Sequence, residues 1–91
     1  MNAQTLGDRV KPQTLGDKLH ETMRVRAHSP ETAGRVLGVA PSDVVLWASD
    51  RELPDRAHHT ALGSYLEVDE RALRGLILRS QMRLAQWRIR D

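Results

Sequence analysis

Arginine is the side chain of this sequence best suited to bind an anion, and its distribution along the 91 residues is uneven. Residues 71–90 contain six arginines and no acidic residue. Because the whole chain carries a net charge of +2, the remainder, by difference, carries −4. A planar guanidinium group binds phosphate through two parallel hydrogen bonds, so the pattern predicts a basic segment that meets an anionic partner. These arginines are Arg71, Arg74, Arg79, Arg83, Arg88 and Arg90.

The other reactive side chains form no catalytic or metal-binding pattern. The absence of cysteine excludes disulfides, thiolate zinc sites and thiol catalysis. His58 and His59 are adjacent, so on a helix they point to different faces and do not hold one ion together. No serine lies in a Gly-x-Ser-x-Gly elbow, and no glycine-rich phosphate loop is present. We therefore expect no enzyme activity, no metal and no cofactor.

The composition indicates a single helical domain. Phenylalanine is absent and only Trp47, Tyr65 and Trp87 are aromatic, so aliphatic residues must fill a modest core. No apolar run approaches the roughly 18 residues that span a membrane, and the N-terminus lacks the apolar block of a signal peptide. These features predict a cytoplasmic protein that does not associate with membranes.

Capping residues and apolar spacing predict five helices and no strand. Thr14 begins the first, and Ser29-Pro30-Glu31 begins the second, which Gly38 ends. The predicted helices are 14–26, 30–37, a third from Pro41 or Ser42 that buries Val44 and Trp47, a fourth from Pro54-Asp55, and a fifth from Asp69 to about Ile89. Residues 1–11 are expected to be a flexible arm. The pentapeptide QTLGD occurs twice, at 4–8 and 13–17, which we interpret as a local duplication.

Residues 29–54 have the layout of a helix-turn-helix, with two short helices joined by a Leu-Gly-Val turn and a proline after the second. Around them, 15–29 is similar to the first helix of the Cro and phage-repressor (XRE) family, and Leu53-Pro54 and 65–73 are similar to its later junctions. The stretch from Leu15 to Leu73 therefore resembles this family. The resemblance implies a five-helix repressor-like fold, in which residues 12–68 form a helix-turn-helix domain that binds double-stranded DNA.

This resemblance implies that the third helix lies in the major groove and that nearby arginines contact phosphates. The expected base-reading residues are Ser42, Asp43, Leu46 and Ser49, and the expected phosphate contacts are Arg24, Arg26, Arg35 and Arg51. The chain departs from the family on this outer face, which carries Val45 and Leu46 where polar side chains usually read base edges. Glycine also stands inside the second helix, at Gly34, where it costs about 1 kcal/mol relative to alanine.

Two functions follow from this face. The first is a sequence-specific transcriptional regulator, acting as a repressor, in which the third helix reads DNA. The second is a non-enzymatic interaction module, such as an antitoxin-like protein or an adaptor. It would bind a protein partner through Val45 and Leu46 or through the C-terminal helix.

The C-terminal helix, 69–91, is longer than a domain of this size needs for its own core. Apolar residues recur in it at spacings of three and four and predict a homodimer interface. These are Leu73, Leu76, Ile77, Leu84 and Trp87. A basic arm on DNA phosphates, and an amphipathic helix at a membrane surface or in a partner's groove, are the alternatives.

Overall fold

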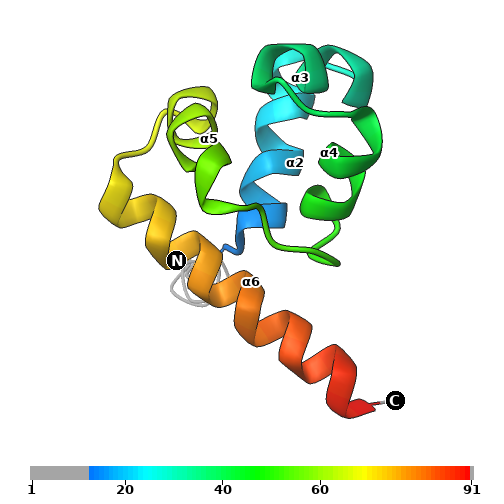
Figure 1. The fold of residues 1–91 in the computed structure, drawn as a ribbon, viewed down its shortest axis with the longest axis vertical. Coiled ribbons are helices and arrows are strands. Elements are labelled where there is room, and N and C mark those ends of the chain that lie inside the picture. The colour runs from blue at the N-terminus through cyan, green and yellow to red at the C-terminus, as the bar shows by residue number, and fades with distance from the viewer. Residues whose placement is uncertain (1–12, 91) are drawn as a thin grey trace, which may run out of the picture.

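The computed structural model describes residues 13–90, with side chains for 13–87. The expected N-terminal arm and the side chains of Arg88 and Arg90 lie outside the described residues. Over the described range the chain forms five α-helices, a short 3-10 turn and no strand, which confirms the all-helical prediction (Figure 1). The elements are α2 (Leu15–Arg26), α3 (Pro30–Leu37), α4 (Pro41–Ala48), η1 (Arg56–His58), α5 (His59–Leu66) and α6 (Glu70–Arg90).

Local sequence signals set the ends of the first helices where they were predicted. Thr14 and Asp17 form a capping box, in which the Thr14 hydroxyl accepts from the Asp17 amide and the Asp17 carboxylate accepts from the Thr14 amide. Ser29 caps α3 by accepting from the Thr32 amide. Gly38 ends α3 with φ 77°, a left-handed conformation that glycine adopts without a side-chain clash.

The predicted start of the fourth helix is wrong by several residues. Pro54 and Asp55 do not begin it; Asp55 is extended, with ψ 156°, and its side chain caps nothing. A 3-10 turn follows, and α5 begins only at His59. The turn brings the His58 ring to within 5.4 Å of the buried Trp47 ring, centroid to centroid. Tertiary packing at this loop therefore overrides the proline start signal.

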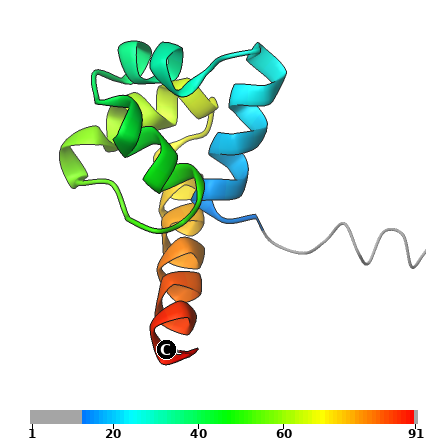
Figure 2. The same cartoon turned by 90° about the vertical axis from the view of Figure 1, so that its right-hand side faces the viewer.

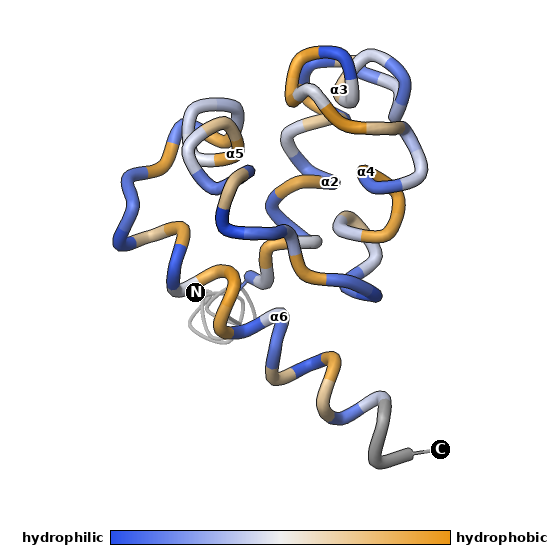
Figure 3. Tube along the Cα trace, viewed as in Figure 1, coloured by the Kyte–Doolittle hydropathy of each residue, from blue (hydrophilic) through white to orange (hydrophobic). Residues whose placement is uncertain are grey.

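One hydrophobic core joins all five α-helices. Figure 3 shows apolar residues recurring between polar ones along the helices. The apolar residues that are buried are mainly leucines, and only one tryptophan and one tyrosine are among them. The buried apolar residues are Leu15, Leu19, Met23, Ala33, Leu37, Val44, Trp47, Leu62, Tyr65, Leu66, Leu73 and Leu76. Because large aromatic side chains are few, burial of many aliphatic groups supplies most of the stability.

Helix α6 packs against α2 and α5 mainly through its first half, and Arg83 in its second half contacts Asp17 of α2. Its 21 residues span about 31 Å, and its C-terminal half continues past the other helices (Figures 1 and 2). No helix of the described residues is long and apolar enough to cross a membrane.

Candidate nucleic-acid interface

Helix α4 is held by its inner face. Val44 and Trp47 are both buried, as the sequence predicts, and α4 packs against α3 and α2. The connection from α3 to α4 is only three residues long, and the carbonyl oxygen of Gly34 accepts hydrogen bonds from the amides of Gly38 and Val39 within it. The two helices therefore form one rigid unit.

Gly34 is required by the close approach of this turn to α3. A Cβ atom at Gly34 would lie 2.7 Å from the carbonyl oxygen of Val39, a separation that real Cβ contacts do not show. The glycine that costs helix propensity in α3 thus permits the tight packing of α3 on the turn.

The outer face of α4 carries few hydrogen-bonding groups. Ser42 and Val45 are exposed, and Asp43 and Leu46 are half-buried. The Ser49 hydroxyl lies 2.8 Å from the carbonyl oxygen of Val45 and donates to it, so its proton is used within the helix. Among the predicted base-reading residues, Ser42 and Ser49 are exposed and Asp43 is half-buried, and Ser49 is the one whose hydroxyl proton is used within α4.

The four predicted phosphate-binding arginines are in different environments. Arg24 and Arg35 are exposed, and no ion pair to either is present among the described residues. Arg26 lies 3.2 Å from a Glu67 carboxylate oxygen and 4.6 Å from the centroid of the Tyr65 ring. Arg26 therefore already has an anionic and an aromatic partner, which connect α2 to the end of α5.

Arg51 is brought against the C-terminal helix. Its guanidinium carbon lies 5.6 Å from the centroid of the Trp87 ring, within the range of a cation–π contact. A residue predicted to bind phosphate and a residue predicted to bind a second protomer thus contact each other, which the sequence did not indicate because 36 positions separate them.

Asp50 is the polar centre of this region, and no local sequence pattern singles it out. It is 3% exposed, with φ 59°, a left-handed conformation that aspartate tolerates better than most residues. Its carboxylate accepts hydrogen bonds from the Thr14 and Ser80 hydroxyls, each at 2.6 Å, and from the Gly16 amide at 3.0 Å. Arg83 completes the set at 2.9 Å.

These contacts fasten three elements together at the exit of α4. Thr14 and Gly16 belong to the start of α2, while Ser80 and Arg83 belong to α6. Ser80 also accepts from the Leu15 amide at 2.8 Å, so a second link joins α2 and α6. Because every donor meets an acceptor, the buried carboxylate positions α6 relative to α4 without an unpaired charge.

Asp17 extends the same cluster toward solvent. Burial acts to raise the pKa of its carboxyl group, but the hydrogen bonds from the Thr14 backbone and from Arg83 outweigh burial and lower this pKa below its ordinary value. Arg83 thus pairs with two carboxylates and is not available to DNA as an unpartnered cation.

The predicted dimerisation stripe of α6 is divided by the fold. Leu73 and Leu76 are buried in the protein's own core and Ile77 is half-buried against it, which corrects the expectation that they face a second protomer. Leu84 is half-buried, and Trp87 is 51% exposed. Only the distal part of the stripe therefore remains accessible.

Three histidines lie in structural or surface positions. The His28 Nδ1 atom and the Tyr65 hydroxyl share a hydrogen bond of 2.8 Å, and His58 packs on Trp47. His59 lines a groove of about 730 Å³ between α5 and α6. Within residues 13–90, no group of three histidine or acidic side chains is placed to hold a metal ion.

Comparison with known proteins identified no relative of this chain. No protein-family model matches the chain, and searches of characterised proteins and of solved structures found no match either.

Proposed function

We propose that the protein is a small, non-enzymatic DNA-binding regulator of transcription, in which α4 lies in the major groove. The observation that carries the proposal is the rigid α3–α4 unit. Gly34 and Gly38 allow a tight turn, the inner face of α4 is anchored by Val44 and Trp47, and its outer face is left to solvent. A braced helix with a free outer face is what groove insertion requires, and the resemblance to the Cro and phage-repressor family supports the same use.

In this proposal Ser42 and Asp43 hydrogen-bond to base edges, and Leu46 meets a thymine methyl group. Ser49, whose proton is used within α4, would act only as an acceptor. Arg24 and Arg35 contact phosphates, and Arg51 joins them from the exit of α4. Discrimination between base pairs is therefore weak for each protomer, since no side chain of α4 reads a purine through two hydrogen bonds.

A two-fold pair of protomers would compensate for this weak reading. We propose that the distal part of α6, through Leu84 and Trp87, holds two copies in register, so that two α4 helices meet half-sites about one helical turn apart. Such a protein would repress by occupying its operator and excluding other proteins from it.

Selection of random-sequence duplexes by the purified protein at near-physiological salt tests the proposal. Enrichment of a palindrome with half-sites roughly one helical turn, about 34 Å, apart is the expected result. With three arginines on phosphates per protomer, a dimer makes about six phosphate contacts, so affinity should fall about 10³-fold between 50 and 200 mM salt. Recovery of no DNA would contradict the proposal.

The exposed apolar residues of this unit favour a second candidate, an interaction module that binds protein. Val36 on α3 and Val45 on α4 are 57% and 50% exposed. The variant Val45→Arg separates the candidates, because it adds a cation to the proposed DNA face and removes an apolar contact. Tighter binding of DNA supports the regulator, whereas loss of a protein complex with DNA binding unchanged supports the interaction module.

A further inference from the structure

Helix α6 has a second apolar face, on the side away from the core. Leu73 and Met82 are nine residues apart, which is two and a half turns, so they lie on opposite sides of the helix. Leu73 is buried, whereas Leu78 and Met82 are 56% and 59% exposed. This outer face, which we call the outer seam, consists of Gly75, Leu78, Met82 and Ala85.

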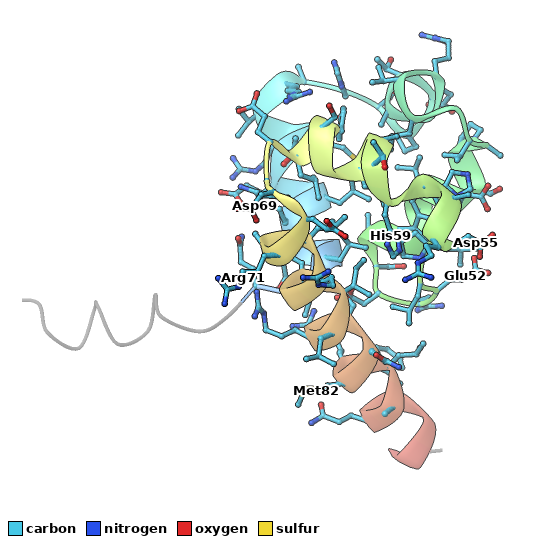
Figure 4. All side chains as sticks on the ribbon, turned by 60° about the vertical axis from the view of Figure 1, so that its left-hand side comes forward. Glu52, Asp55, His59, Asp69, Arg71 and Met82 are labelled. Atoms are coloured by element: carbon cyan, nitrogen blue, oxygen red, sulfur yellow. The ribbon has the colours of Figure 1, made fainter. Side chains whose placement is uncertain are left out.

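The spacing of the outer seam is that of a coiled coil. Its four residues are separated by three, four and three positions, as the a and d positions of a heptad repeat are. The seam begins where α6 packs on α5 and continues along the part of α6 that extends beyond the other helices, where Figure 4 shows Met82. A facing helix could therefore lie along the seam without meeting the rest of the domain over its distal half.

A shallow groove beside the outer seam has the outline of a site that receives a side chain from another helix. It has a volume of about 430 Å³ and is lined by Arg74, Ile77, Leu78 and Gln81, together with Gly75 and His59. The first four residues stand at positions i, i+3, i+4 and i+7 of α6, so they surround a space that can receive one side chain of a facing helix. Gly75 deepens the groove, because it places no side chain there.

Charge decides which helix fits. With the outer seam at positions a and d, Arg74 and Gln81 take position g, and Arg79 takes position e. A parallel pair of α6 helices would set Arg74 opposite Arg79 of the other copy. An antiparallel pair centred near residue 80 would set the two copies of Arg79 against each other. Both pairings place like charges together, so the flanks disfavour a second copy of α6.

The same flanks attract carboxylates. Among the described residues, the one acidic partner of Arg74 is Glu70, at 3.4 Å. Both side chains are mostly exposed, so this pair neutralises little of the charge in water. Arg71, seen near the start of α6 in Figure 4, is exposed at the next position along the seam. An acidic flank on a facing helix would therefore gain ion pairs that a basic flank would not.

We propose that the outer seam binds an amphipathic helix of a second protein, in which an apolar stripe is flanked by aspartate or glutamate. One apolar side chain of that helix enters the groove between Arg74 and Gln81, and its acidic residues meet Arg74 and Arg79. This is the helix-in-groove mode of recognition. The surface differs from α4 and from Leu84 and Trp87, so the inference does not depend on DNA binding.

Two synthetic helical peptides test the proposal against the full-length protein. Both carry leucine at positions a and d over four heptads; one has glutamate and the other lysine at e and g, so that each peptide repels its own copies. Titration by fluorescence anisotropy should show binding of the glutamate peptide and at least tenfold weaker binding of the lysine peptide. Equal affinity for both peptides, or no binding of the glutamate peptide, would overturn the proposal.

Variants of exposed residues place the contact on the outer seam without disturbing the core. Leu78→Gln and Met82→Gln should each weaken binding of the glutamate peptide at least tenfold. Val25→Gln, at an exposed valine of α2, should leave this affinity unchanged. Arg74→Glu should lower the affinity for the glutamate peptide and raise the affinity for the lysine peptide.

Two outcomes would assign the face to other partners. Self-association, measured by light scattering and abolished by Met82→Gln, would give it to a second copy and overturn the proposal. Loss of duplex DNA affinity in Leu78→Gln, without loss of peptide affinity, would assign the face to DNA and would also overturn the proposal.

Discussion

The Gly16 amide donates to the Asp50 carboxylate at 3.0 Å, and a Cβ atom at residue 16 would lie 2.6 Å from that same oxygen. The hydrogen bond and the exclusion of a side chain are thus two results of one close approach. Thirty-four residues separate the pair, yet this contact sets the distance between the start of α2 and the exit of α4.

Gly16→Ala tests this contact through the sign of the change in the free energy of unfolding. Glycine to alanine in a helix ordinarily stabilises a protein by up to about 1 kcal/mol, but here the methyl group meets Asp50 and the backbone of Ala48. We expect a loss of about 1–3 kcal/mol in the free energy of unfolding, measured with urea.

Gly7→Ala is the matched control, because Gly7 occupies the same position in the other QTLGD copy. The two copies continue differently, since Pro12 stands after the first copy at the position that Glu21 occupies after the second. Equal effects of the two substitutions would show that the copies are interchangeable.

Asp50→Ala removes the acceptor shared by four donors. The hydroxyl protons of Thr14 and Ser80 and the Gly16 amide would lose their buried acceptor, at a cost of about 2–4 kcal/mol in unfolding free energy. Chemical unfolding measures this loss, and Asp55→Ala, at an exposed aspartate, should change stability by less than about 0.5 kcal/mol. A similar result for both variants would refute the central role of Asp50.

The lowered pKa of Asp17 predicts a dependence of stability on acid. Because the folded state holds this carboxyl pKa below the ordinary 3.8, the stabilisation is complete above pH 3.8 and is lost as the pH falls through the folded value. The free energies of unfolding of the wild-type protein and of Asp17→Asn should therefore differ most near neutral pH, and this difference should shrink below pH 3.8. If the difference stays constant down to pH 2, the ion pair with Arg83 is not its cause.

Gly34→Ala and Gly75→Ala should have opposite effects on stability. At Gly34 the new methyl group meets the Val39 carbonyl oxygen, so we expect α3 and α4 to separate, with a loss of about 1–3 kcal/mol in unfolding free energy and weaker DNA binding. At Gly75 the nearest atom is an Arg79 side-chain nitrogen at 3.5 Å, so alanine should stabilise α6 by up to about 1 kcal/mol. Thermal unfolding of the two variants distinguishes a glycine required by packing from one that is not.

Arg24 and Arg26 provide a comparison between binding and stability. Arg24 is exposed, so Arg24→Ala should weaken DNA binding and flatten its salt dependence by about one unit of slope, with stability unchanged. Arg26 contacts Glu67 and Tyr65, so Arg26→Ala should lower the melting temperature. Its effect on DNA affinity at low temperature should be the smaller of the two. A larger effect of Arg26 on DNA affinity would mean that it leaves Glu67 to bind phosphate.

Much of the fold could be predicted from neighbouring residues. The capping pair at Thr14, the Ser29-Pro30 start and the glycine stop at Gly38 act within one helical turn, so the sequence alone located α2 and α3 to within a residue. The three-residue spacing of Val44 and Trp47 likewise identified the buried face of α4.

Other features depend on contacts between distant residues and were decided by the tertiary structure alone. α6 carries two apolar stripes, and periodicity could not say that Leu73 and Leu76 enter the core while Leu78 and Met82 remain outside. The role of Asp50 could not be predicted, because its partners Thr14 and Ser80 lie 36 and 30 positions away. Helical periodicity determines which residues share a face, whereas the neighbour that each face meets is set only when the helices pack.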